Sequence, residues 1–285
     1  MSADPRVTLA RPDLAAAALE GLAPAERYAP TQALRLSRPS APILAAPDPG
    51  AQQVDQLLYG ELFDALDRQG DFLWGQARRD GYVGFAPADA FAPAEGSPPT
   101  HRVRHIRTYA FAEPSIKAAP SGPFSLNALL AIEAEEGDFA REAGGGWFWR
   151  AHLAPIGGFE TDPATVAERF LGAPYLWGGR DSLGLDCSGL VQQALYACGL
   201  ACPRDNDQQA ALGRDAPTGQ PARGDLVVWA GHIGMMLDAE RLIHASGHWM
   251  AVVVEPLAAV VARNGLPSAH RRLSARRSSL RRRRP

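Results

Sequence analysis

The sequence predicts a multidomain chain in which two small antiparallel β-barrels are followed by an α+β domain. Residues 41–157 consist of short alternating runs interrupted by glycines, and two parts of this region resemble each other at a spacing of roughly sixty residues. After the glycine pair at residues 157–158, helical periodicity comes first and short strands follow. A chain of 285 residues, 46% hydrophobic and 21% charged, can bury a core in more than one domain.

Residues 1–40 form an N-terminal extension rich in alanine and proline. We expect one short helix at residues 11–22 and otherwise extended chain packed on another domain, without chemistry of its own. Acids and prolines interrupt the start of the chain where a signal peptide needs an apolar core, and no segment approaches the roughly 20 apolar residues of a membrane span. The three cysteines, Cys187, Cys198 and Cys202, provide no disulfide framework. These features favour a cytoplasmic protein.

The first predicted barrel covers residues 41–96 and the second residues 97–157. In the first, glycines at positions 60, 70, 75, 81 and 84 separate strands of about five residues, as expected for a small antiparallel barrel. Both regions contain a strand that enters an acidic turn and then an aromatic strand bounded by glycine. The sequences YGE at residues 59–61 and DGYVGF at residues 80–85 resemble bacterial SH3-like domains, and the match is weaker in the second region.

The predicted C-terminal domain covers residues 158–273. A helix is expected after Asp162 or Thr161 as the N-cap, with Pro163 in its first turn. A second helix is expected in DCSGLVQQALYACGL, with Cys187 in its first turn, because apolar residues recur at positions 190, 191, 194, 195 and 198. The sequences GDLVVW, HIGMML and RLIHAS then predict three short strands.

Cys187 is the strongest candidate for a reactive side chain. At the first turn of a helix, free N–H groups and the helix dipole lower a thiol pKa from about 8.5 toward neutrality, and the thiolate is the nucleophile. The backbone N–H of such a residue is also free to receive an oxyanion. The glycines around it, in WGG and LGLDCSG, would let a substrate backbone approach. A lone cysteine at a helix start is more often structural, so the interpretation depends on its partners.

His232 and His244 are the candidate partners, twelve residues apart in two predicted strands. A loop with an odd number of residues would place both imidazoles on one face as diagonal neighbours, and a two-residue loop would place them on opposite faces. On one face, His232 could act as base toward Cys187 while His244 holds its other ring nitrogen.

Zinc binding is an alternative, because one cysteine and two histidines could supply three ligands. Cys198 or Cys202 could add a fourth. However, Cys198 falls on the apolar stripe of the helix and Cys202 after its end, which would strain such a site. We therefore predict no metal and no other cofactor.

Residues 162–273 resemble the NlpC-type cysteine peptidases of bacterial peptidoglycan metabolism, whose domain is papain-like. The resemblance is carried by Tyr175, WGG at residues 177–179, Gly184, DCSG at residues 186–189, and the sequences GDLVVW, GHIGMM and LIHAS. It implies that Cys187 is the nucleophile, His232 the base and His244 the third member. It also implies that the Tyr175 hydroxyl helps the Cys187 N–H to hold the oxyanion.

Tandem SH3-like domains before such a domain resemble a subgroup that cleaves stem peptides between D-γ-glutamate and the diamino acid. Its members require a free N-terminal L-alanine, and their first SH3-like domain forms part of the pocket wall. A free ammonium requires acids, and a wall from another domain excludes longer substrates. The resemblance implies these substrate-binding residues: Asp186 and Asp205 for the amine, Ser188 and Trp177 in the lining, and Glu61 and Tyr82 from the first barrel. Asp205 could equally cap the following helix.

The sequence therefore predicts a cytoplasmic γ-D-glutamyl-L-diamino acid endopeptidase that recycles murein peptides. The alternatives are an amidase or acyltransferase acting on another cell-wall bond with the same residues, and a non-catalytic binding module. Residues 274–285 form an arginine-rich tail, expected to be disordered, since a basic tail can bind nucleic acid or anionic lipid but is commonly solvated. We expect a peptidoglycan-derived peptide as partner, no nucleic acid and no membrane span; the oligomeric state stays open.

Overall fold

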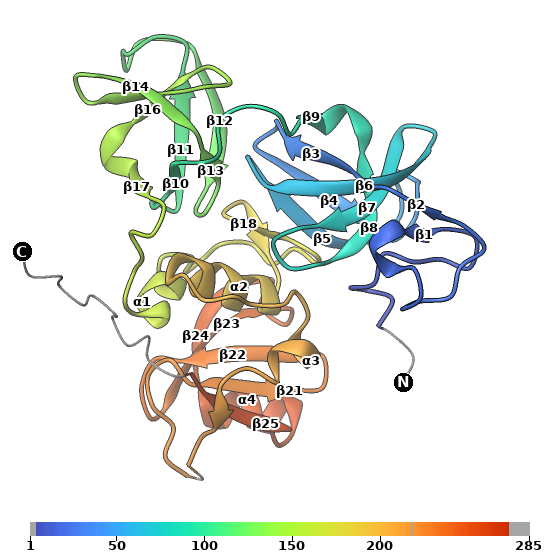
Figure 1. Ribbon diagram of the computed structural model, residues 1–285. Coiled ribbons are helices and arrows are strands. Elements are labelled where there is room, and N and C mark those ends of the chain that lie inside the picture. Colours follow the sequence, from blue (N-terminus) through green and yellow to red (C-terminus); the bar gives the residue numbers. More distant parts are fainter. Residues whose placement is uncertain (1–3, 218, 274–285) are drawn as a thin grey trace, which may run out of the picture.

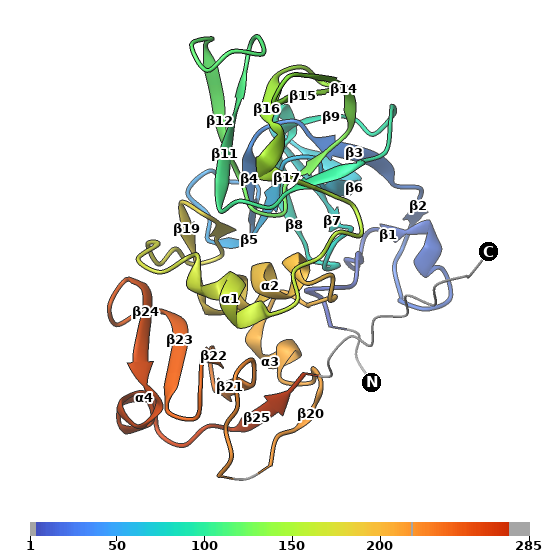
Figure 2. The ribbon, with the colours of Figure 1, turned by 90° about the vertical axis from the view of Figure 1, so that its left-hand side faces the viewer.

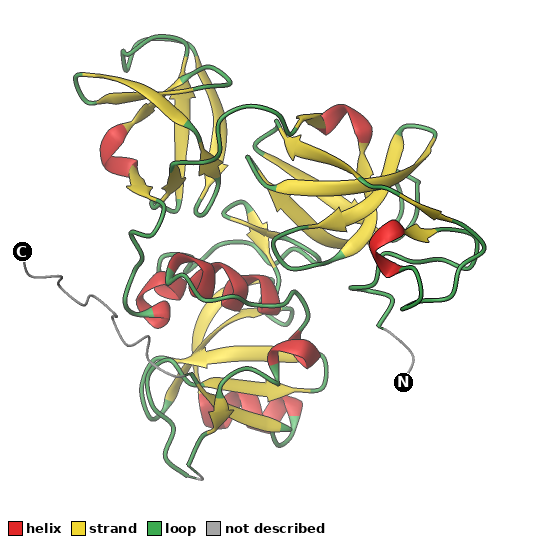
Figure 3. Ribbon diagram, in the orientation of Figure 1, coloured by secondary structure: helices red, strands yellow, loops and turns green. Residues whose placement is uncertain are grey.

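The computed structural model describes residues 4–217 and 219–273. Two β-rich domains lie side by side, and the C-terminal domain lies below both (Figure 1). Strands dominate and helices are concentrated in the C-terminal domain (Figure 3). The predicted fold class, SH3-like barrels followed by an α+β peptidase-type domain, is confirmed. The predicted basic tail, 274–285, lies outside the described residues. No helix of the described residues is long and apolar enough to cross a membrane.

The first barrel is one antiparallel sheet in the order β5-β4-β8-β7-β6-β3-β9. Its core contains Leu36, Ile43, Leu57 and Phe63, all with no exposed surface. The sheet starts before the boundary expected at residue 41, because β3 pairs with both β6 and β9. Its elements are β3 (Gln32–Leu36), β4 (Ser40–Leu44), β5 (Gln53–Leu58), β6 (Leu62–Gln69), β7 (Phe72–Ala77), β8 (Val83–Pro87), η2 (Ala88–Ala90) and β9 (Phe91–Pro93).

The N-terminal extension packs on the first barrel, as predicted, but the expected helix at residues 11–22 is wrong. The extension forms only β1 (Ala15–Ala16), the 3-10 turn η1 (Ala17–Leu19) and β2 (Tyr28–Ala29). Leu9, Leu14 and Ala16 are buried against Trp74 of the barrel. Burial of these apolar side chains outweighs the helix propensity of the alanine run, because a short isolated helix is marginal without tertiary contacts.

The second barrel combines the sheets β12-β11-β16-β15-β14 and β13-β10-β17 around Val103, Ala110, Phe124 and Phe148. Its elements are β10 (His101–Val103), β11 (Arg107–Phe111), β12 (Pro120–Ser125), β13 (Leu129–Leu130), β14 (Ile132–Glu136), β15 (Phe139–Glu142), β16 (Trp147–Trp149), η3 (Arg150–His152) and β17 (Leu153–Pro155). A turn of this barrel reaches the C-terminal domain, where Asn127 donates to the backbone oxygen of Gln193 over 2.9 Å.

The C-terminal domain is an antiparallel sheet in the order β20-β25-β21-β22-β23-β24. Helices α1 and α2 lie between this sheet and the barrels (Figure 2). On the other face, Val260 of α4 packs against Val227, Trp229, Met236 and Leu242. The elements are α1 (Pro163–Glu168), β18 (Arg180–Asp181), β19 (Gly184–Leu185), α2 (Cys187–Ala197), α3 (Asn206–Gln209), β20 (Arg214–Asp215), β21 (Leu226–Trp229), β22 (His232–Met236), β23 (Arg241–Ser246), β24 (Ala251–Pro256), α4 (Leu257–Asn264) and β25 (Ala269–Arg272).

Buried ion pairs join the first barrel to the C-terminal domain. Arg204 has 1% of its surface exposed and contacts Asp55 of β5 and Asp186 of its own domain, each over 2.7 Å. Arg180, with no exposed surface, contacts Asp55 over 3.3 Å and also pairs with Glu61. Since each buried charge is paired, the two domains form a fixed interface.

The predicted role of the WGG glycines is wrong. Gly178 has φ 71°, and a Cβ there would lie 2.6 Å from the Gln53 backbone oxygen. A Cβ on Gly179 would lie 2.5 Å from the Gly184 oxygen. These glycines therefore admit the protein's own backbone, that of the first barrel in one case, rather than a substrate.

Candidate active site

Cys187 lies where the sequence predicts, at the first residue of α2. Asp186 is the N-cap, and its Oδ1 accepts from the Gly189 N–H over 2.8 Å. The cysteine is buried within the protein but lines a cavity of about 250 Å³. Tyr82 of the first barrel and Asp205 line the same cavity. The nucleophile candidate therefore faces a compartment that two domains enclose.

The predicted neutral-pH thiolate is wrong for the substrate-free protein. Burial, and next the negative charge of Asp186, raise the pKa of the Cys187 thiol to about 12. The backbone N–H groups of Ile233 and Ser188 lower it, but by less. The helix start is present, but its cap is a buried carboxylate beside the sulfur, and this opposes ionisation. The thiol must therefore lose its proton during the reaction.

His232 and His244 lie on one face of the β22–β23 hairpin, as the odd-loop geometry requires. Met235 pairs with Ile243 and Met236 with Leu242, which places His244 opposite Gly234 and diagonal to His232. Nε2 of His232 is 2.7 Å from Nδ1 of His244. The two imidazoles are thus directly coupled.

Glu255 extends this pair, and the sequence analysis missed it. In β24, Val253 pairs with His244, so Glu255 lies diagonal to His244 on the same face. Its Oε2 is 2.9 Å from Nε2 of His244. Arg263 of α4 donates to the same oxygen over 2.6 Å. Recognising a fourth strand after RLIHAS would have revealed Glu255 by the alternation rule that relates the two histidines.

The carboxylate of Glu255 determines the proton positions along this relay. Burial acts to raise the pKa of Glu255, but hydrogen bonds from Arg263, Trp249 and His244 lower it to about 2, so it is ionised and accepts only. His244 must then carry its proton on Nε2, and its Nδ1 accepts from Nε2–H of His232. This leaves the lone pair of His232 on Nδ1, available as a base.

Both imidazoles are neutral near pH 7. Burial, and then the neighbouring His244, lower the pKa of His232 to about 4. Burial also lowers the pKa of His244, although Glu255 opposes that shift. A neutral imidazole can accept a proton from the neutral thiol, so the resting pair is thiol and imidazole rather than an ion pair.

The cavity of Cys187 adjoins a second cavity lined by the two histidines. The second one has about 350 Å³ and is lined by His232, His244, His248 and Arg263. Tyr175 and Gly231 line both cavities. His232 is the first residue of β22, next to the turn at Gly231, and the Ile233 N–H points to the sulfur. Sulfur and imidazole therefore come from neighbouring positions at this end of the sheet.

Tyr175 and Trp177 are both brought to the predicted site. Trp177 lines the cavity of Cys187 and is 57% exposed, so it forms an accessible wall. Burial, and next the nearby Cys187, raise the pKa of the Tyr175 hydroxyl. Tyr175 therefore stays protonated and can donate toward an oxyanion formed at Cys187.

Asp186 and Ser188 also line the cavity, but their polar atoms are engaged within the protein. The Asp186 carboxylate accepts five hydrogen bonds, from the N–H groups of Gly178 and Gly189, the Ser188 hydroxyl and two Arg204 nitrogens. A carboxylate offers about four lone-pair sites. No acceptor site remains for a substrate amine, so the expected amine role of Asp186 is not supported; Asp186 instead fixes the start of α2.

Asp205 and Tyr82, which come from two domains, meet in the lining of the cavity. The Tyr82 hydroxyl donates to Oδ2 of Asp205 over 3.3 Å. Asp205 occupies the N-cap position of α3, but its side chain makes no capping hydrogen bond, so capping does not explain it. Burial raises the pKa of Asp205, against the effect of Arg204 and Arg6. This carboxylate is the acid best placed to meet a substrate cation.

Glu61 is not brought to the site. It is 2% exposed, pairs with Arg180 and with Arg79 over 2.8 Å, and accepts from the Leu58 N–H over 3.0 Å. Burial acts to raise the pKa of Glu61, but Arg180 and Arg79 lower it below its usual range. Glu61 stabilises the domain interface, and the lining of the Cys187 cavity does not include it.

Metal ligation finds no support in this geometry. Among residues 4–217 and 219–273, no three His, Cys, Asp or Glu side chains are grouped so that they could hold a metal ion. Cys198 and Cys202 are buried free thiols, and burial is the main cause of the raised pKa of each.

Comparison with known families matches two segments of the chain. Residues 172–265 match the NlpC/P60 family, and residues 43–91 match the bacterial dipeptidyl-peptidase SH3 domain. The chain thus carries an NlpC/P60 peptidase domain behind a dipeptidyl-peptidase-type SH3 domain. Cys187, His232, His244 and Glu255 all lie in the NlpC/P60 domain, and Tyr82 lies in the SH3 domain.

Part of the chain is also similar to curated proteins. A gamma-D-glutamyl-L-lysine dipeptidyl-peptidase of Bacillus subtilis is 36% identical over 84 residues, which cover 27% of this chain and 28% of that protein. A peptidoglycan endopeptidase, RipB, of Mycobacterium tuberculosis is 32% identical over 104 residues, covering 30% of this chain and 43% of that protein. The matched segments thus span less than half of these relatives.

The arrangement of all three domains also has a solved counterpart. The crystal structure of an NlpC/P60 family protein from Bacillus cereus superimposes with a TM-score of 0.74, covering 84% of this chain and 99% of that chain. The two sequences are 20% identical, so this likeness concerns the fold.

Proposed function

We propose that this protein is a cysteine endopeptidase that hydrolyses the bond between D-γ-glutamate and the L-diamino acid of peptidoglycan stem peptides with a free N-terminal L-alanine. The observation that carries the proposal is the convergence of Asp205 and Tyr82, from two domains, on the cavity that Cys187 lines. An acid that lines a 250 Å³ cavity together with Cys187 suits a short peptide that ends in an ammonium group.

The charges of the two adjoining cavities support a short peptide with charges at both ends. Asp186, Asp205 and Asp207 line the Cys187 cavity, with Arg6 as its only lining arginine among the described residues. His248 and Arg263 line the histidine cavity. An ammonium group would be favoured in the first cavity and a carboxylate in the second, which matches electrostatic complementarity in peptide recognition.

The proposed reaction uses the relay described above. Nδ1 of His232 takes the thiol proton as the Cys187 sulfur attacks the γ-carbonyl carbon. The Cys187 N–H and the Tyr175 hydroxyl stabilise the oxyanion. The protonated His232 then gives its proton to the departing amino group of the diamino acid, leaving a thioester. Water, deprotonated by His232, hydrolyses the thioester and restores the thiol.

The name of the Bacillus subtilis relative, a gamma-D-glutamyl-L-lysine dipeptidyl-peptidase, supports this bond specificity. A role in recycling released murein peptides, in the cytoplasm, belongs to the same proposal. Its support is the small size of the Cys187 cavity, which suits short peptides better than polymeric cell wall.

The test is digestion of a defined peptide panel by wild-type protein and the Cys187→Ala variant. The panel contains L-Ala-γ-D-Glu-L-Lys, the same peptide with diaminopimelate, their N-acetyl forms, and intact sacculi. We expect release of L-Ala-D-Glu from the free peptides by wild type only, detected by mass spectrometry. Cleavage of sacculi with the free peptides left intact would contradict the proposal, and products cut at another bond would indicate an amidase or transferase.

A further inference from the structure

The start of the N-terminal extension crosses from the first barrel to the peptidase domain beside the active-site cavity. We call residues 4–10 the strap. The Arg6 backbone oxygen accepts from the Val83 N–H over 2.8 Å, and the Val7 oxygen accepts from the Gln76 side chain over 2.9 Å. Leu9 is 2% exposed, in the cluster that contains Trp74. The strap backbone is thus fixed to the barrel, next to Tyr82.

The side chain of Arg6 reaches across to the peptidase domain. Its Nη1 lies 2.8 Å from Oδ2 of Asp205 and 2.9 Å from Oδ1 of Asp207, and its Nη2 lies 2.8 Å from Oδ2 of Asp207. Asp4 of the strap completes the cluster, with its Oδ2 2.8 Å from Nη2 of Arg6. One guanidinium therefore lies among three carboxylates.

Arg6 and Tyr82 contact the same atom, Oδ2 of Asp205. Both side chains line the cavity of Cys187. The guanidinium thus borders the carboxylate that we assign to the substrate amine, and through Arg6 the strap contributes to the lining of the cavity. Sequence reasoning did not identify Arg6, because the N-terminal extension contains no recognised motif.

We infer that Arg6 is a specificity-determining residue that closes the cavity beyond the amine subsite and excludes peptides with an acylated N-terminus. This inference rests on the proposed function. The three carboxylates exceed the one guanidinium in charge, so an added ammonium group is still attracted. An N-acyl group brings no positive charge, and it needs the volume that Arg6 fills. Admitting it requires breaking charge-assisted hydrogen bonds at Asp205 and Asp207.

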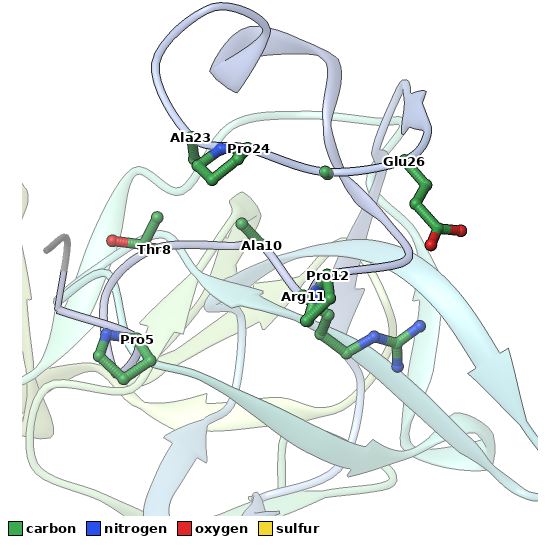
Figure 4. Close-up of a pocket in the computed structure, with 9 residues that line it drawn as sticks. Pro5, Thr8, Ala10, Arg11, Pro12, Ala23, Pro24 and Glu26 are labelled. Carbon is green, nitrogen blue, oxygen red and sulfur yellow. The ribbon is translucent and has the colours of Figure 1, made fainter.

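Part of the strap lines another cavity. Pro5, Thr8 and Ala10 line a cavity of about 510 Å³ whose other wall includes Ala23 and Pro24 (Figure 4). The contacts of Arg6 with Asp205 and Asp207 therefore add to the barrel contacts that hold the strap.

The experiment compares kcat/KM for L-Ala-γ-D-Glu-L-Lys and its N-acetyl form in wild type, Arg6→Ala and Arg6→Lys. We expect Arg6→Ala to raise the acetylated-to-free ratio at least tenfold, and Arg6→Lys to stay within threefold of wild type. Arg11→Ala is the matched control, because Arg11 lies in the same extension but pairs with Asp67, away from Cys187. Its ratio should equal that of wild type.

An unchanged ratio in Arg6→Ala, with the variant folded by circular dichroism, would overturn the inference. An equal rise in Arg11→Ala would also overturn it, by indicating general loosening of the extension. If wild type cleaves no γ-D-glutamyl peptide, the proposed function fails separately. In that case the exclusion of acylated N-termini by Arg6 is tested by the rate at which a dipeptidyl chloromethyl ketone, free or N-acetylated, labels Cys187. The acetylated-to-free ratio of labelling rates should be at least tenfold higher in Arg6→Ala than in wild type.

Discussion

Glu255 lies diagonally across two adjacent strands from His244, with its Oε2 2.9 Å from the imidazole Nε2. His244 is in turn diagonal to His232. Because the Glu255 carboxylate accepts from His244, and His244 accepts from Nε2–H of His232, the lone pair of His232 is on Nδ1. The positions of the protons in the site are therefore determined by Glu255, two strands away from the base.

Glu255→Gln should weaken the preference for the His232 tautomer that has its lone pair on Nδ1. The amide can donate to His244 and favour the wrong tautomer, and loss of the negative charge lowers the pKa of His232 further. We expect kcat to fall about 10- to 100-fold, within the contribution of general acid–base catalysis. The acid limb of the kcat/KM profile, which reflects protonation of His232, should move to lower pH.

Arg263→Ala is the matched comparison, because the positive charge of Arg263 lowers the pKa of both histidines. Its removal should move the acid limb to higher pH, opposite to the shift in Glu255→Gln. Shifts of both variants in the same direction would contradict the relay.

Alkylation of Cys187 by iodoacetamide should report the raised pKa of its thiol, about 12. Since only the thiolate reacts, the second-order rate should keep rising above pH 9 in the substrate-free protein. Peptide mapping, with Cys187→Ala as the background for Cys198 and Cys202, assigns the site. A rate that levels off near pH 7 would mean that the helix start, and not burial, controls the thiol.

Arg204→Met should destabilise the protein by about 3–5 kcal/mol, because it leaves Asp55 and Asp186 buried without their shared cation. Urea unfolding followed by tryptophan fluorescence measures the change. In contrast, Arg38→Met removes an ion pair with Asp89 whose side chains are 52% and 71% exposed, and should cost less than about 1 kcal/mol. If both substitutions lowered the free energy of unfolding equally, the buried contacts of Arg204 would not stabilise the protein more than an exposed ion pair does.

Stability should fall as the pH drops from about 6.5 to about 4, the ordinary and folded pKa values of His232. In this window the unfolded imidazole takes up a proton and the folded one does not, so stability rises with pH. The contribution is about 3 kcal/mol at 1.36 kcal/mol per pKa unit. In His232→Gln, the free energy of unfolding should change correspondingly less between pH 4 and 6.5. If it depends on pH in the same way in wild type and variant, His232 is not a buried neutral imidazole.

The sequence was sufficient for local features and insufficient for contacts between domains. The start of α2 at Cys187 and the shared face of the two histidines follow from helical and strand periodicity, and both are confirmed. Glu255 and Arg263 escaped notice because β24 and α4 were not predicted. Arg6, Arg180 and Arg204 depend on how distant segments dock, and periodicity carries no information about that.

The buried Arg204 side chain links the first barrel to the start of the helix that carries Cys187. It contacts Asp55 of the barrel and, at its other end, the Asp186 carboxylate that caps the nucleophile's helix. A hinge motion that separated the two domains would remove Arg204 from Asp55 or from Asp186. It would therefore leave a buried carboxylate without this counter-charge and change the surroundings of the Cys187 sulfur. Chimeras that graft this peptidase domain onto a foreign barrel would therefore need to transplant the Asp55 strand with it.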